Sequence, residues 1–414
     1  MTDAAEQTAD CCIAGGGPAG MMLGYLLARA GLEVVVLEKH ADFFRDFRGD
    51  TIHPSTIGLL GELGLRERFL DLPHNSVRRL DAVVNGYRVH PVDFGRLAPP
   101  NDFIALMPQW DFLNFLAEEG GRFPGFRLRM STEATGLVYD GGRVAGVTAT
   151  GPDGELHIRS RLTVAADGRD SLLRAAAGLK PVDFGVPIDV LWFRMPTPEK
   201  VPPPTLINID HRDMAVTIPR GDYFQVGLLI PKGGLDDLRE QGLDAFRRRI
   251  SSVAPFLTPV AGSITGWEQV KLLTVQVNRL ARWQLPGMLC IGDAAHAMSP
   301  AFGVGVSYAI QDAVAAANTL AAPLLFGSLS ERQLALVQHR RERAVARMQS
   351  IQLRLHTVIA RPGGGSILPD PVPLWFRVLA RAAAPLLQRV TARMIGRGFR
   401  PVRLASWLRD TPGA

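Results

Sequence analysis

Cysteine is scarce in this chain, with only three among 414 residues. Cys11 and Cys12 are adjacent, Cys290 stands alone, and no CxxC pair occurs. This pattern excludes a disulfide framework and also the paired dithiol of a disulfide reductase. We interpret the three thiols as core residues of a protein kept in a reducing compartment, and we expect a cytoplasmic location.

Long apolar runs are also missing. No stretch reaches the ~18 consecutive apolar residues of a membrane helix, because the Ala-rich run after Asp312 is interrupted by Asn318, Thr319 and Pro323. The first ten residues are polar and acidic, so we expect no secretory signal. With 47% hydrophobic and 21% charged residues, the chain can bury a large core. We therefore expect an ordered protein of two or three domains without a membrane span.

Charge is unevenly distributed. Residues 331–414 contain 15 Lys and Arg against 4 Asp and Glu, a net charge of +11, whereas the remaining residues carry −5. The arginines recur at helical spacing instead of forming a cluster, as in Arg377, Arg381 and Arg389. A solvated helix face is the simplest interpretation, and we expect no nucleic-acid partner. Peripheral contact with an anionic membrane stays open, as does the choice between monomer and homodimer.

Residues 10–38 predict a strand, a glycine turn, a helix and a second strand. The turn has the spacing GxGxxG, and an acidic residue closes the second strand ~20 residues further on, where it can bind a ribose diol. Glycines at these positions permit a tight turn and a close approach to a pyrophosphate. The residues that we expect to bind a dinucleotide here are Gly15, Gly17, Pro18, Ala19, Gly20, Glu38 and Lys39.

The rest of the chain alternates between patterns typical of helices and patterns typical of strands. Leucine spacing predicts helices over 55–70 and 109–119, and residues 127–150 resemble short strands with a turn at Gly141-Gly142. Proline-punctuated strands fill 181–266, a strand follows at 288–291, and helices are expected after Gly305, over 331–360 and over 374–395, with a linker at 362–373. We predict an α/β fold with a discontinuous first domain (1–78, 100–180 and 266–360), an inserted mostly antiparallel β domain (79–99 and 181–265) and a C-terminal helical segment (361–414).

Two later motifs give the chain a family resemblance. One is Val164-Ala165-Ala166-Asp167-Gly168-Arg169, and the other is Cys290-Ile291-Gly292-Asp293-Ala294-Ala295-His296, followed by Pro300 and Gly303-Val304-Gly305. With the glycine turn, and in this order over nearly the whole length, they resemble the FAD-dependent aromatic monooxygenases, the group of para-hydroxybenzoate hydroxylase and the ubiquinone-ring and polyketide hydroxylases. The resemblance implies a Rossmann-like FAD-binding domain with an inserted, mostly antiparallel β-sheet substrate domain and C-terminal helices.

The resemblance also implies the cofactor contacts. Asp167 and Gly168 are expected near the FAD pyrophosphate, Asp293 at the ribityl chain, and the Gly303–Gly305 backbone at the flavin ring, with Pro300 in the same loop. Arg48 and Gln109 stand where the family has FAD contacts. The family commonly has Gly-Gln-Gly-x-Asn where this chain has Gly303-Val304-Gly305-Val306-Ser307. We expect His296 to be structural. His53, near Arg48, could approach the substrate cavity, but a loop histidine is usually solvated, and we expect the same here.

The implied chemistry is hydroxylation. In the family, NADH or NADPH reduces FAD, O₂ adds at flavin C4a, and the hydroperoxide transfers one oxygen to an electron-rich ring. We thus expect a monooxygenase for a small aromatic or polyketide-like molecule, with no metal site and no identified catalytic acid or base. No second GxGxxG occurs, so the nicotinamide is expected to bind transiently. Alternatives are a flavin-dependent reductase or dehydrogenase of an isoprenoid-like substrate, and a membrane-surface or nucleic-acid binding protein with a structural flavin.

Substrate contacts are expected from strands of the inserted β domain. Alternation with a period of two turns about half of the side chains of a strand toward one face. The sequence does not tell which half faces the substrate. The candidates are Trp192, Phe193, Met214, Thr217, Tyr223 and Gln225.

Overall fold

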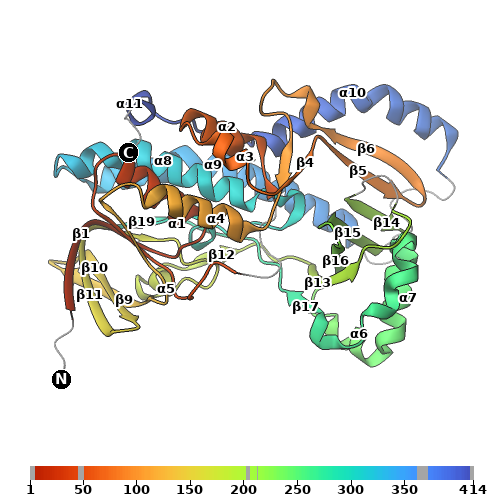
Figure 1. Cartoon of the computed structure of the whole chain (residues 1–414), viewed down its shortest axis with the longest axis horizontal. Coiled ribbons are helices and arrows are strands. Elements are labelled where there is room, and N and C mark those ends of the chain that lie inside the picture. The colour runs from red at the N-terminus through yellow and green to blue at the C-terminus, as the bar shows by residue number, and fades with distance from the viewer. Residues whose placement is uncertain (1–4, 45–50, 202–205, 212, 361–371, 411–414) are drawn as a thin grey trace.

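The computed structural model describes residues 5–44, 51–201, 206–211, 213–360 and 372–410. Arg48 and most of the expected linker at 362–373 lie outside these ranges. Within them, none of the helices is long and apolar enough to cross a membrane. The chain forms a mixed α/β fold with two large sheets (Figure 1).

The first sheet has five neighbouring parallel strands at its centre, in the order β20-β11-β1-β2-β8. An antiparallel strand, β19, extends one edge, and β10 and β9 branch from β11. The central strands are buried on both faces, which explains why β2 is a continuous run of valine and leucine. The strands are β1 (Ala5–Ala14), β2 (Val34–Leu37), β8 (Phe126–Arg129), β9 (Glu133–Asp140), β10 (Arg143–Gly151), β11 (Gly154–Ala165), β19 (Gln284–Leu285) and β20 (Met288–Cys290).

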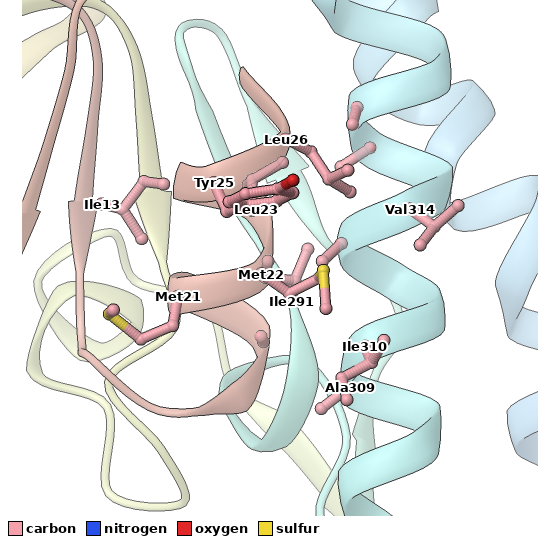
Figure 2. Packing of buried hydrophobic residues seen from close by; sticks show 14 of the residues in the cluster. Ile13, Met21, Met22, Leu23, Tyr25, Leu26, Ile291, Ala309, Ile310 and Val314 are labelled. Carbon is pink, nitrogen blue, oxygen red and sulfur yellow. The ribbon is translucent and has the colours of Figure 1, made fainter. Parts of the chain in front are cut away.

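Helix α1 (Pro18–Arg29) follows β1 and packs against α8 (Gly305–Leu325). Figure 2 shows Met22 and Leu26 of α1 pointing toward α8, and Ile310 and Val314 of α8 belong to the same buried cluster. The other helices of this half are α4 (Gln109–Gly120), which also contacts α1, α5 (Leu172–Ala176) and the long α9 (Glu331–Ile359).

One expected helix is in fact two. The leucine spacing over 55–70 predicted a single element, but the chain forms α2 (Pro54–Glu62) and α3 (Arg66–Leu70). Gly64 between them has φ +74°, a conformation that ends a helix. The two helices lie beside a small sheet of β3 (Thr51–Ile52), β7 (Ile104–Leu106) and β4 (Asn75–Val77).

The second large sheet has the order β17-β13-β16-β15-β14-β5-β6. Its neighbours are antiparallel except for β14 and β5, so the expectation of mostly antiparallel pairing is confirmed. The sheet also includes β17, which lies beyond residue 265, where the inserted β domain was expected to end. The limits of the domains stay a prediction. The strands are β5 (Arg79–Val84), β6 (Tyr87–Asp93), β13 (Ile188–Pro196), β14 (Ile207–Asp210), β15 (Asp213–Pro219), β16 (Tyr223–Pro231) and β17 (Lys271–Leu273).

Two helices cover one face of this sheet, α6 (Leu235–Gln241) and α7 (Leu243–Val253) (Figure 1). Phe193 of β13 packs edge to face on Phe246 of α7, with ring centroids 5.3 Å apart. The chain ends with α10 (Leu374–Gly396), which runs along β6, and the short α11 (Ser406–Arg409). β12 (Pro181–Asp183) and β18 (Asn278–Leu280) pair with each other in a separate two-stranded sheet. Along the chain, each of them stands between a strand of one large sheet and a strand of the other.

All three cysteines are buried free thiols, as expected of core residues. Burial raises the pKa of Cys12 and Cys290 to about 12. These thiols are therefore protonated and unreactive at neutral pH.

Leu26→Ala tests the contact between α1 and α8. Leu26 is fully buried there, so its truncation should lower the free energy of unfolding by about 2–5 kcal/mol. The matched control is Leu336→Ala on the exposed side of α9, for which a change within about 0.5 kcal/mol is expected. Denaturant unfolding measures both, and equal losses in the two variants would contradict the packing described here.

Candidate functional site

The carboxyl ends of four parallel strands stand side by side. The register pairs Ala14 of β1 with Ala165 of β11 and with Leu37 of β2, and Ala165 with Cys290 of β20. The residues that directly follow these strands therefore meet at one edge of the sheet. They are the glycine turn, Glu38, the Asp167-Gly168 segment and the Gly292-Asp293 segment. Ligands of open α/β sheets bind at this edge.

Two glycines of the first turn are required by close backbone approaches. Gly15 has φ +106°, and a Cβ there would lie 2.3 Å from the carbonyl oxygen of Ala166. A Cβ at Gly20 would lie 2.0 Å from the carbonyl oxygen of Gly15. At Gly17, in contrast, a Cβ would meet no protein atom within 4 Å. The turn is thus closed on the sheet side and open at Gly17, as a cradle for a phosphate requires.

Helix α1 begins at this open side. Pro18 is its first residue, Gly17 at the N-cap has no side chain, and the first turn has no acidic residue. The N–H groups and the positive end of the helix dipole are therefore available to an anion. The arrangement fits a pyrophosphate.

Glu38 is positioned by backbone donors. Its Oε2 accepts a hydrogen bond from Gly16 N at 3.1 Å, and its Oε1 accepts one from His40 N at 3.1 Å. Each carboxylate oxygen has a second lone pair, so the group can still accept from the hydroxyls of a ribose. Lys39 is placed differently: its exposed Nζ lies 3.8 Å from Oε1 of Glu133, in a surface ion pair.

The second and third motifs are joined by an ion pair that the sequence analysis did not foresee. Arg169 Nε donates to Asp293 Oδ2 at 3.1 Å, and both side chains are about one-third exposed. Arg174 is buried and holds the same two segments, because it donates to the carbonyl oxygens of Ala294 (3.1 Å) and Arg169 (2.6 Å). The carboxylate expected at the ribityl chain is thus held at the sheet edge by an arginine of the neighbouring motif.

Asp167 is engaged locally. Its carboxylate accepts hydrogen bonds from the Ser171 hydroxyl and from Leu173 N at the start of α5. Burial raises the pKa of Asp167, and these two bonds work in the opposite direction. The side chain therefore shapes the loop in which Gly168, with φ +89°, follows it. A contact between this loop and the cofactor stays a prediction.

A buried charge network lies behind the third motif. Asp312 of α8 accepts from Gly292 N (3.1 Å) and His296 Nε2 (2.6 Å) through Oδ2, and from Arg341 Nε (2.8 Å) through Oδ1. Burial favours the neutral form of Asp312, but His296 and Arg341 outweigh it and lower its pKa. His296 is structural, as expected. Asp312 was not foreseen, although a lone acid in the Ala-rich α8 was an available signal.

The loop before α8 is fixed by the residues around β3. Gly303 has φ +65°, and its carbonyl oxygen accepts from Thr51 Oγ1 at 2.9 Å. A ring nitrogen of His53 lies 3.0 Å from the same oxygen, and the other ring nitrogen lies 3.0 Å from the carbonyl oxygen of Ile395. The expectation of a solvated His53 is therefore wrong, because this histidine is fully buried between the loop and the end of α10.

In the segment from Pro300 to Ser307, which the family resemblance places at the flavin ring, no protein atom covers the backbone at Gly305. Pro300 precedes the one-turn helix Ala301–Gly303. Gly305 is the first residue of α8, and a Cβ there would meet no protein atom within 4 Å. Val304 and Ser307, where the family commonly has amide side chains, are both buried. The backbone N–H groups at the start of α8 remain the available donors.

One face of the second large sheet is covered by α6 and α7, and the opposite face packs toward the core of the first large sheet. The register puts Trp192, Met214, Tyr223 and Gln225 on the face opposite α7, whereas Phe193 and Thr217 face α7. Gln109 begins α4, and Asp111 lies in the first turn of that helix. Burial raises the pKa of Asp111, and the nearby Arg220 guanidinium acts in the opposite direction. The β15–β16 turn therefore lies near the start of α4.

A family model described as "FAD binding domain" matches residues 8–351. The chain belongs to this FAD-binding family. It is similar to 6-methylpretetramide 4-monooxygenase from Streptomyces rimosus, with 33% identity over 90% of this chain and 92% of that protein. It is also similar to rifampicin monooxygenase from Streptomyces venezuelae, with 28% identity over 73% of this chain but only 62% of that longer protein.

The fold of this family member is that of solved aromatic hydroxylases. The structure of p-nitrophenol 4-monooxygenase from Pseudomonas putida matches with a TM-score of 0.72 and 19% identity, over 94% of this chain and 95% of that one. The chain is an FAD-dependent monooxygenase. The open cradle at Gly17 and the fixed carboxylate of Glu38 fit the phosphates and ribose of FAD.

Gly20→Ala tests the cradle. The added methyl group would press on the Gly15 carbonyl oxygen and displace the turn, so the dissociation constant for FAD should rise about tenfold or more. Gly61→Ala is the matched control, because its methyl group would be 4.0 Å from the nearest atom inside α2. The FAD content of the purified variants measures the effect, and full occupancy in Gly20→Ala would contradict this assignment.

Two buried histidines should make stability depend on pH. Burial lowers the pKa of His53 and of His356 from 6.5 to about 4. The unfolded chain thus binds protons more readily, and stability is lost as the pH falls from 6.5 to 4, by up to about 3 kcal/mol for each histidine.

His356→Gln should flatten the decline in unfolding free energy between pH 7 and pH 4. His339→Gln, at an exposed position of α9, should leave the slope unchanged. Denaturant unfolding at several pH values compares the two slopes, and identical slopes would refute a role for His356.

Proposed function

We propose that this monooxygenase hydroxylates a fused-ring aromatic molecule of the polyketide type. The support is the relative with 33% identity along nearly its whole length, whose name specifies 6-methylpretetramide as substrate. The sheet face with Trp192, Met214 and Tyr223 is mostly apolar and has Gln225 and Arg194 as polar groups, which suits a flat ring system with polar substituents. Once NADH or NADPH has reduced it, bound FAD would react with O₂ and so supply the oxygen-transfer chemistry.

We assign the cofactor contacts by part. The glycine turn (Gly15, Gly17, Pro18, Ala19, Gly20) binds the pyrophosphate and Glu38 the adenosine ribose, with Gly168 nearby. Asp293, held by Arg169, accepts from the ribityl hydroxyls. Gly303 and Gly305 bring the flavin ring to the start of α8, whose backbone N–H groups and dipole stabilise negative charge on that ring. We also assign Gln109, at the start of α4, to the flavin.

The described part of the chain offers no histidine as a base at this site. Both ring nitrogens of His53 contact carbonyl oxygens, and His296 is bound to Asp312. We infer that proton removal depends on the acidity of the substrate phenol itself. The protein's role is then to hold the ring, exclude water and keep the flavin loop in place.

Substrate-dependent oxygen incorporation tests the proposal. The purified yellow protein, given NADH or NADPH and a polycyclic phenol, should oxidise the nucleotide in a 1:1 ratio to product, and mass spectrometry should find one atom from ¹⁸O₂ in that product. The matched control is a saturated polycycle of similar size, which should stimulate neither process. Reduction or desaturation of the compound without ¹⁸O would refute the proposal in favour of a reductase.

A further inference from the structure

Helix α10 packs against β6. Near its C-terminal end, Gln388 Nε2 donates to the carbonyl oxygen of His90 (3.0 Å) and Thr391 Oγ1 to that of Pro91 (2.6 Å), both in β6. Ala392 and Ile395 are buried on the same side, and Gly396 lies against Phe94 and Leu97. The C-terminal part of the helix is therefore held firmly along β6 (Figure 1), whereas almost all described residues between Leu374 and Leu387 are exposed.

Large apolar side chains stand beside the solvated arginines on the exposed part of this helix. Leu374 is 73% exposed and Trp375 68%, far above the usual exposure of such residues. The large exposed apolar residues fall in two groups, 374–379 and 386–390, and the exposed Ala382 and Ala383 connect the groups into one stripe by steps of three and four residues. They are Leu374, Trp375, Val378, Leu379, Leu386, Leu387 and Val390.

The charged residues of α10 itself are all arginines. Arg377, Arg381, Arg389 and Arg393 are all exposed, and α10 contains no Asp or Glu. The chain continues with Arg397, Arg400 and Arg403 before its next acidic residue, Asp410. A partner that covers this surface must thus accept apolar side chains and offer anions close by.

This combination argues against two other occupants. A second copy packed on the same stripe would bring the arginines of both helices together without a carboxylate from either. A nucleic acid would match the charge but would offer the exposed leucines no apolar surface to enter. An anionic lipid surface satisfies both requirements, because apolar side chains enter the acyl boundary while arginines reach the phosphates.

We propose that α10 docks this protein on the surface of an anionic lipid bilayer. The helix lies in the plane of the membrane with its leucines and Trp375 at the level of the headgroups, where tryptophan is favoured. Because α10 runs along β6, the sheet with the proposed substrate face is held beside the lipid phase. The docking itself does not depend on the proposed substrate, and it stands or falls by a separate measurement.

Flotation with lipid vesicles tests the docking. The holoenzyme should float with vesicles of equal parts phosphatidylglycerol and phosphatidylcholine and stay behind with phosphatidylcholine alone. High salt should weaken the binding by screening the arginines. Leu379→Gln/Leu386→Gln should weaken it by about tenfold or more, and Arg389→Gln/Arg393→Gln by roughly fivefold for each arginine.

The matched control is Leu325→Gln/Leu336→Gln, which removes two exposed leucines from α8 and α9. This variant should float like the unmodified protein, and all variants should keep their FAD and their NAD(P)H oxidation. Three results would overturn the proposal. They are equal flotation of the Leu379/Leu386 variant, a dimer of the unmodified protein that the same two substitutions dissociate, and DNA binding that survives them with no vesicle binding by the unmodified protein.

Discussion

The parallel register of β20, β11, β1 and β2 is the constraint on which the site depends. Parallel strands that are hydrogen-bonded neighbours end at one edge of the sheet, so segments far apart in sequence emerge next to one another. Each of the four then makes a different contribution: a glycine turn, the carboxylate of Glu38, an arginine-bearing loop and the carboxylate of Asp293. The arrangement is set by backbone hydrogen bonds and needs few side chains to maintain it.

The side chains that do maintain it are charged and buried. Asp312 reaches Gly292 N from one side while Arg341 and His296 neutralise it, and Arg174 joins the two neighbouring loops by their carbonyl oxygens. A buried charge without a partner is strongly destabilising, so these residues act as a set. Their placement explains why the third motif has a fixed turn although its own sequence is mostly small residues.

Much of this was predictable, for a physical reason. Residues 10–38 carry their own signals, because glycine spacing and an unbroken valine run report local backbone geometry. The break at Gly64 was missed because leucine spacing continues across it and outweighs a single glycine. Arg341 and His53 could not be placed because their partners, Asp312 and Gly303, are distant in sequence. Alternation predicted two faces for β13, but only the position of α7 shows that Phe193 belongs to the covered one.

The order of strands also has a consequence for biosynthesis. β1 leaves the ribosome well before the strands beside it in the sheet, because β11 begins only at Gly154 and β20 only at Met288. At ordinary rates of translation the first glycine turn waits roughly a quarter of a minute to a minute for the last of these neighbours. Flavin capture is therefore a late event, and a chain truncated before Met288 has the opening motif but no completed sheet edge to hold it.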